Sequence, residues 1–354
     1  MAGFPSTIVS PVSGGIVPAG AIGAQLSAIT RRAVVPSVFV QIYQTHPLLS
    51  LLLSNAQPAR GGISQITIPA QGASFTAFNW GSFAADFPMP SDEAAIENAQ
   101  FNLKLGMVPI GFFGMEAIIQ SSEVIIPKLR AVTSDAATVI RQALAAAIYS
   151  NNYNQNLALD SLYQAYDNGA NSPAYGGITR ANALWWQGQY LPGIGSVSSR
   201  AGMATTLTRV MTGAAGEAPD FAVMNPADWA TLLQDFMSSE SYYNTADMRW
   251  GRDDIANAGF RAIRVLDTPF FPDPFCPRGE CYMINSRYLS MYLSEYAPFV
   301  FSGFESAIPQ GQIASIGVLI TALDLVCSKP SSGAHLTGIT GAAWPNTPSP
   351  PAIM

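Results

Sequence analysis

The chain has 354 residues, of which 49% are hydrophobic and only 11% are charged, and its formal net charge is −6. Soluble domains usually carry about 25% charged residues, so this chain has too few charges to cover a surface in water. Because interfaces between chains are depleted in Lys and Glu, we expect other chains to cover much of the surface. A monomer with a surface of Ser, Thr, Asn and Gln is the alternative.

The acidic balance argues against a protein that binds DNA or RNA through a basic face. The N-terminus lacks the basic segment of a secretory signal, and no apolar run reaches the ~18 residues of a membrane span. Cys276, Cys281 and Cys327 are too few for a disulfide framework. Cys276 and Cys281 are close enough in sequence to bridge a short loop, whereas reduced thiols fit a cytoplasmic product better.

The first third of the chain predicts an arm and two strands. Residues 1–30 contain no charged side chain and are rich in Gly, Pro, Ser and Ala, which indicates an extended arm held by a neighbouring subunit. A strand is expected at 63–69. Strict alternation over 100–108 predicts a half-buried strand whose apolar face carries Phe101, Leu103, Leu105 and Met107.

About thirty residues (71–99) connect these two strands, and connections of that length are functional or disordered. Aromatic side chains stand among their Gly, Ser and Ala residues, although a solvated loop has no use for them. We expect a hairpin arm that lies on a neighbouring subunit; an Ω-loop packed on its own domain is the alternative. The residues expected at an assembly interface are Arg31, Arg32, Trp80, Phe83 and Phe87.

A helix is expected over 134–150, because apolar residues recur there at i, i+3, i+4 and i+7. Ser134 would cap its first turn, Asp135 would place negative charge at the positive end of the helix dipole, and Asn151 and Asn152 would end it. Since β-structure precedes it and an α/β unit follows it, we expect a spine between two unlike halves. Its apolar stripe is Ala136, Val139, Ile140, Ala143, Leu144, Ala147 and Ile148.

The chain after this helix is expected to form an α/β unit. The paired glycines of Tyr175-Gly-Gly-Ile-Thr-Arg180, ahead of Trp185 and Trp186, indicate a bend with close backbone approach. A helix ending at Gly213 precedes a strand–turn–helix, with a strand at 220–224, Asn225 as cap and Pro226 at the first helical position. Further strands are expected at 260–266, 281–285, 289–293, 299–301 and 313–326, before a Pro-rich tail at 328–354.

No constellation of residues with catalytic chemistry is evident. With only His46 and His335, the chain has no histidine cluster for a metal and no Ser-His-Asp set in plausible folded segments. Cys276 and Cys281 have the wrong spacing for a zinc site, and no nucleotide-binding or hydrolase motif occurs. We therefore predict a protein that is not an enzyme, with no catalytic residue, cofactor or metal.

The order of these elements resembles a tailed-bacteriophage major capsid protein of the Hong Kong 97-like fold, over about residues 15 to 328. The matching pieces are an arm, a hairpin (63–108), the helix, the Tyr175–Arg180 motif with Trp185, Phe221-Ala-Val-Met-Asn-Pro226-x-x-Trp229 and Val265-Leu-Asp-Thr-Pro269. The resemblance implies an α+β fold with an N-terminal arm (1–60), an extended E-loop (61–115), a P-domain containing the spine helix (116–195 and 308–330), an A-domain (196–307) and a Pro-rich tail (331–354).

The resemblance also implies what the protein does. Copies of the chain would form the hexamers and pentamers of an icosahedral shell around a double-stranded DNA genome, without sequence-specific DNA binding and without a membrane. Portal and decoration proteins are the other partners implied. The chain starts almost directly at the arm, which implies a separate scaffolding protein or a chain already matured. The shell would assemble in the host cytoplasm and become part of the virion, and three lysines leave few donors for isopeptide cross-links.

Three other interpretations stay open. An encapsulin-type nanocompartment shell would share the fold but enclose enzymes in place of a genome. An oligomeric α/β enzyme is the alternative from another class of protein. A secreted adhesin or surface-layer protein would share the low charge, but it should show repeats and a signal peptide.

Overall fold

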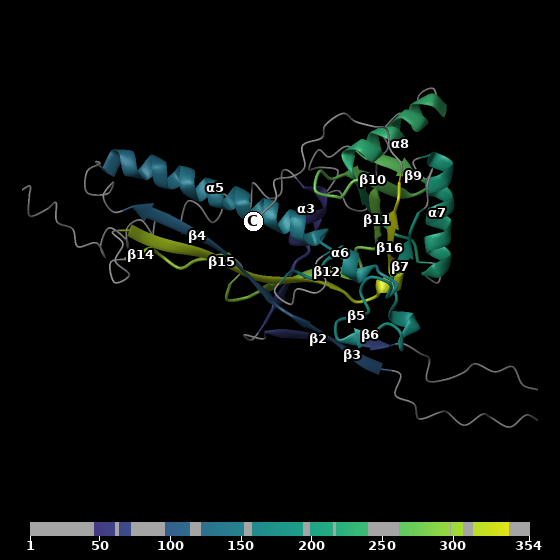
Figure 1. Ribbon diagram of the computed structural model, residues 1–354, viewed down its shortest axis with the longest axis horizontal. Coiled ribbons are helices and arrows are strands. Elements are labelled where there is room, and N and C mark those ends of the chain that lie inside the picture. Colours follow the sequence, from purple (N-terminus) through teal and green to yellow (C-terminus); the bar gives the residue numbers. More distant parts are fainter. Residues whose placement is uncertain are drawn as a thin grey trace, which may run out of the picture. The chain divides into compact units, whose positions relative to one another are not determined.

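The computed structural model describes residues 46–60, 64–71, 96–113, 122–151, 158–193, 199–214, 217–239, 262–297, 299–306 and 314–339. These residues fall into two compact units, each assembled from segments far apart in the sequence. The first unit contains the described residues of 105–142 and 296–322, and the second contains those of 43–104, 143–295 and 323–354. Helix α5 (Ser122–Ile148) and strand β15 (Ala314–Cys327) are labelled in Figure 1. Each of them contributes residues to both units.

The first unit contains a small sheet built on the N-terminal part of β15. Its other strands, all paired with β15, are β4 (Lys104–Phe113), β13 (Val300–Phe301) and β14 (Glu305–Ser306). Gly317 of β15 permits close packing, because a Cβ there would lie 2.5 Å from Cζ of Phe301. Among the residues of this unit whose burial the structure describes, the buried apolar side chains are Ile110, Ala136, Ala137, Ile140, Phe299, Phe301 and Leu319.

Helix α5 begins earlier than the sequence predicts. The expected cap Ser134 lies in the helix interior, where its carbonyl oxygen accepts the hydroxyl of Thr138 at 3.1 Å. Ser134 and Asp135 looked like a start signal, but helical backbone continues upstream through Pro127. Pro127 lies beyond the first turn, where a proline removes one backbone hydrogen bond and crowds the carbonyl four residues earlier, and the helix includes it nonetheless. The predicted end is confirmed, since the helix stops at Ile148, just before Asn151.

The apolar stripe of α5 is largely confirmed. Burial follows a four-residue spacing through Ala136, Ile140, Leu144 and Ile148, which places these side chains on one face. Val139 departs from the prediction, because 41% of its surface is exposed.

The second unit contains a six-stranded mixed sheet in the order β7-β16-β11-β8-β10-β9. In chain order its strands are β7 (Gln189–Leu191), β8 (Phe221–Met224), β9 (Ile263–Val265), β10 (Thr268–Pro272), β11 (Glu280–Ile284) and β16 (Ala334–Thr337). Helices α7 (Arg200–Gly213) and α8 (Pro226–Ser239) lie beside this sheet (Figure 1). The core between them includes Met203, Leu207, Val210, Met224, Leu232, Phe270, Met283 and Leu336.

Local capping explains where these two helices start. The side chain of Ser199 accepts the backbone N–H of Gly202 at 3.1 Å at the start of α7. Asn225 accepts the N–H of Ala227 at 3.0 Å, and Pro226 occupies the first position of α8. The predicted strand–turn–helix and the helix ending at Gly213 are therefore confirmed.

The expected linker-like tail is wrong for the residues up to 339. Strand β16 lies inside the sheet, parallel to β7 and antiparallel to β11. His335 is fully buried and stacks on Tyr282, with ring centroids 4.4 Å apart and planes 4° apart. Because β16 has only four residues, it is too short to show a hydrophobic period in the sequence. Pairing with β7 and β11 determines that it forms.

The rest of the second unit consists of short elements. Strand β1 (Gln57–Ala59) pairs with β12 (Leu289–Ser294), which pairs with the C-terminal part of β15. Two further strand pairs, β2 (Gln65–Gln71) with β3 (Ile96–Asn102) and β5 (Ala174–Tyr175) with β6 (Ile178–Thr179), are separate two-stranded sheets, and the N–H of Gln100 donates to the carbonyl of Gly176 between them at 2.8 Å. The short helices are α3 (Pro47–Ser54), α6 (Leu162–Ala165), η2 (Leu184–Trp186) and η5 (Pro330–Ser332).

The predicted half-buried strand over 100–108 is correct only in part. Phe101 is buried at the end of β3, but the strand is interrupted at Leu103 before β4 begins. Beyond the break, Leu105 and Met107 are 56% and 60% exposed. The alternation predicts the strand backbone correctly, but no part of the described chain covers the apolar face of β4.

Candidate functional site

The residues expected at an assembly interface, Arg31, Arg32, Trp80, Phe83 and Phe87, all lie outside the described residues. Their role stays a prediction. Among the residues that the structure does describe, three features bear on function: exposed apolar side chains of the first unit, a buried ion pair, and a buried pair of carboxyl groups.

Large apolar side chains are exposed at several places in the first unit. On β4, Leu105 and Met107 belong to one face, because alternate residues of a strand point the same way. On the opposite face, Ile110 is buried, and a Cβ at Gly106 would lie 3.0 Å from Cγ2 of Thr321 on β15. One face of β4 therefore packs within the unit and the other carries apolar groups into solvent. Val139, Tyr296 and Val300 are also exposed, by 41%, 70% and 39%.

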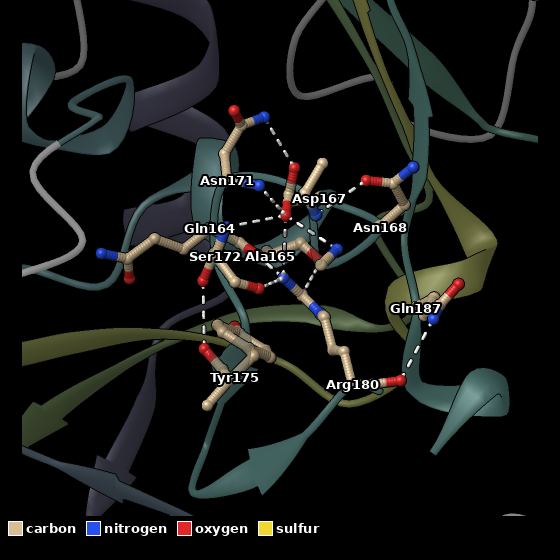
Figure 2. Close-up of polar contacts among 12 residues, drawn as sticks. Gln164, Ala165, Asp167, Asn168, Asn171, Ser172, Tyr175, Arg180 and Gln187 are labelled. Carbon is tan, nitrogen blue, oxygen red and sulfur yellow. Dashed lines mark hydrogen bonds and ion pairs between the residues drawn. The ribbon is translucent and has the colours of Figure 1, made fainter. Parts of the chain in front are cut away.

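The Tyr175–Arg180 motif leads to a buried ion pair in the second unit (Figure 2). Arg180 has no exposed surface, and its Nη1 lies 3.8 Å from Oδ2 of Asp167. The guanidinium donates hydrogen bonds of 2.7 to 3.4 Å to four backbone carbonyls, those of Gln164, Ala165, Ser172 and Trp186. Burial lowers the pKa of Arg180, and the charge of Asp167 opposes that change.

Asp167 organises the loop that follows it. Its Oδ2 accepts the backbone N–H groups of Gly169, Asn171 and Ser172 at 2.8 to 3.0 Å, and its Oδ1 accepts the side-chain amide of Asn171. Figure 2 shows these donors converging on one carboxylate. Because the polar atoms of this centre are bonded to backbone groups and to one another, we assign it the role of fixing the loop between α6 and β5 rather than of binding a substrate.

The glycines of the motif fulfil the predicted close approach. Gly176 and Gly177 have φ values of +57° and +79° and form the turn between β5 and β6. A Cβ at Gly176 would lie 2.7 Å from Cζ of Phe101, whereas a Cβ at Gly177 would meet nothing within 4 Å. Trp186 closes the motif by donating its indole N–H to the carbonyl of Tyr175 at 3.0 Å.

Two carboxyl groups lie together elsewhere in the second unit. Asp324 is fully buried on β15, and its Oδ1 accepts the backbone N–H of Asp160 at 3.2 Å and of Leu325 at 3.0 Å. Burial, and then the nearby charge of Asp160, raise the pKa of Asp324 to about 8. Asp324 therefore mostly retains its proton at neutral pH.

The sequence alone does not predict these polar centres. Arg180 belongs to a recognisable motif, but no comparable motif in the sequence marks Asp167, Asp160 or Asp324. Asp167-Asn-Gly is a turn signal, which could have indicated a carboxylate that organises a loop. No local signal brings together Asp160 and Asp324, which are far apart in the sequence.

The titratable groups that the structure describes do not form a reactive centre. No group of three or more His, Cys, Asp or Glu side chains in the described residues could hold a metal ion. Cys276, Cys281 and Cys327 are free thiols, and burial raises the pKa of each, in the case of Cys327 to about 12. Such thiols are poor nucleophiles at neutral pH. Within the described residues, no helix is both long and apolar enough to cross a membrane.

Comparison with known proteins identifies the fold. No family model and no curated protein matches the sequence. Among solved structures, the chain is similar to the cyanophage A-1(L) capsid asymmetric unit, with a TM-score of 0.59 and 16% identity over 83% of this chain and 93% of that chain. It is also similar to the holo-SrpI encapsulin complex from Synechococcus elongatus PCC 7942, with a TM-score of 0.54 and 10% identity over 85% and 90%. The expected α+β capsid fold is thereby confirmed, and this chain shares it with a cyanophage capsid and an encapsulin.

Proposed function

We propose that the chain is a major capsid protein of a tailed bacteriophage. Copies of it would assemble into an icosahedral shell that encloses double-stranded DNA, as part of the virion. The observation that carries the proposal is the apolar face of β4, with Leu105 and Met107 more than half exposed, in a chain that has the fold of a phage capsid. Contact with neighbouring copies would remove such a face from water, at roughly 25 cal/mol per Å² of apolar surface.

Within this proposal, the residues of the subunit are assigned to the domains of the family. Residues 1–60 would be the N-terminal arm, 61–115 the E-loop, 116–195 with 308–330 the P-domain, and 196–307 the A-domain. Leu105 and Met107 would then lie near the base of the E-loop, next to the loop that carries Trp80 and Phe83. A separate scaffolding protein, a portal and decoration proteins belong to the same proposal.

Particle formation tests the proposal directly. Sedimentation velocity and electron microscopy of the purified chain should reveal closed shells of megadalton mass. A chain that forms only dimers or tetramers at high concentration would contradict a shell protein and favour the oligomeric enzyme.

The encapsulin likeness supports a second candidate, a nanocompartment shell with protein cargo. The capsid structure has the higher TM-score and identity, and this favours the viral function. Particles purified from the natural source distinguish the two. DNA protected from nuclease inside the shell would support the capsid, and a co-purifying enzyme without DNA would support the nanocompartment.

The E-loop assignment has its own test. Trp80→Ala with Phe83→Ala should leave a folded subunit whose assembly into closed shells is impaired, because truncation of a buried interface aromatic typically costs ~2 kcal/mol or more. Circular dichroism would report folding and sedimentation would report assembly. An unfolded double variant would place these residues in the subunit core, and normal shells would place them on an uncovered surface.

A further inference from the structure

The turn between β9 and β10 contains a leucine in an unusual backbone conformation. Val265 and Thr268 face each other across the two strands, so Leu266 and Asp267 form a two-residue turn. Leu266 has a φ of +52°, and it is the one residue other than glycine with positive φ in the described part of the chain.

Leucine does not suit this position. The favoured two-residue hairpin turns require positive φ at their first residue, and Gly, Asn or Asp normally supply it. A larger side chain places its Cβ against the following carbonyl oxygen. Burial within the subunit does not compensate for this strain, because 61% of the Leu266 side chain is exposed. Residues held in such conformations cluster at functional positions.

The hairpin holds Leu266 rigidly outward. On either side of the turn, Val265 and Phe270 are buried in the core of the second unit. The hydroxyl of Thr268 donates to the carbonyl of Pro219 at 3.0 Å, and the indole N–H of Trp229 donates to the carbonyl of Phe270 at 3.1 Å. These contacts hold the backbone on either side of Leu266, so contact with a partner would cost little backbone freedom at this turn.

We propose that Leu266 is an assembly anchor, covered by a second copy of this chain when subunits associate. The proposal rests on the proposed function. The chemistry of the tip points to protein as the partner, because the exposed carboxylate of Asp267 beside Leu266 would repel nucleic-acid phosphates and anionic lipid headgroups. The sequence as a whole contains only 11% charged residues, and the cores of protein interfaces are depleted in charge, which favours another copy of this chain as the partner.

Two substitutions at this position separate strain from contact. Leu266→Asn suits positive φ and removes the apolar side chain at similar size. Leu266→Met keeps both the strain and an apolar side chain. We expect Leu266→Asn to raise the melting temperature of unassembled subunits by about 2 °C and to raise the concentration needed for shell assembly about tenfold. Leu266→Met should assemble like the wild type.

The measurements are differential scanning fluorimetry below the wild-type assembly concentration and light scattering above it. Normal assembly of Leu266→Asn would overturn the anchor while leaving the shell function intact. A lower melting temperature of unassembled Leu266→Asn would also overturn it, because Leu266 would then stabilise its own subunit. A wild-type chain that stays monomeric at every concentration would overturn the shell function and the anchor together.

Discussion

The two units of the subunit differ in how their apolar side chains are covered. The second unit encloses a core between its six-stranded sheet and the helices α7 and α8, and buried polar groups such as Arg180 have partners inside it. The second unit exposes large apolar side chains only at isolated positions of its described residues, Leu184 and Leu266, whereas in the first unit one face of β4 and parts of α5 and β13 leave apolar side chains in solvent. We therefore expect the second unit to contribute most of the stability of the isolated subunit, and the first unit to bury more apolar surface on association. Four substitutions test this division, in decreasing order of expected effect on the isolated subunit.

Arg180→Met should have the largest effect. It leaves Asp167 buried without its cation and removes the donor of four carbonyls, and breaking a buried pair costs about 3–5 kcal/mol. Urea denaturation followed by circular dichroism measures the free energy of unfolding. Arg287→Met, at an exposed arginine, is the control and should change it by less than about 0.5 kcal/mol. Equal stability of the two variants would mean that the ion pair is dispensable.

Gly176→Ala should cost about 2–3 kcal/mol, because the new methyl group would meet Phe101 in addition to the strain of positive φ. Gly177→Ala is a matched control, since it shares the positive φ but meets nothing within 4 Å. It should cost about 1 kcal/mol. Calorimetry of both variants isolates the contact with Phe101, and equal melting temperatures would argue that Phe101 simply moves aside.

Asp324→Asn should change how stability depends on pH. The folded-state pKa of about 8 lies above the ordinary value of 3.8, so the folded chain holds a proton that the unfolded chain releases. Wild-type stability should therefore fall as pH rises between these values. The variant should lack this decline and be the more stable protein at pH 8. Thermal unfolding from about pH 4 to about pH 9, with Asp135→Asn as an exposed control, measures the slope. Parallel slopes for wild type and Asp324→Asn would contradict the retained proton.

Leu105→Ser with Met107→Ser should have the smallest effect on the isolated subunit, within about 0.5 kcal/mol, because both side chains are already exposed. The same double variant should assemble poorly, since the face that we propose to be covered by other copies becomes polar. Chemical denaturation and sedimentation of one preparation test both halves. A clear loss of subunit stability would place this face inside the first unit after all.

The sequence predicted those elements whose signals are local. Asn225-Pro226 ahead of an apolar period marks the start of α8, and the paired glycines mark the β5–β6 turn. Predictions that depended on distant partners were less accurate. Strand β16 forms because β7 and β11 lie on either side of it. An alternating pattern predicts a strand with an apolar face, but it does not predict whether that face, which carries Leu105, is covered. The carboxyl pair joins residues more than 160 positions apart, and the predicted interface residues from Arg31 to Phe87 lie outside the described chain.

The position of β16 between β7 and β11 has a consequence for how the subunit is made. A polypeptide is synthesised from its N-terminus, so β7 and β11 exist long before the residues that pair with both of them. In the described chain β7 joins the sheet only through β16. Until Ala334–Thr337 has been translated, the sheet has a gap, and His335 cannot stack on Tyr282. Nascent chains on one messenger RNA therefore carry unpaired strand edges, and the second unit closes only when synthesis has passed residue 337.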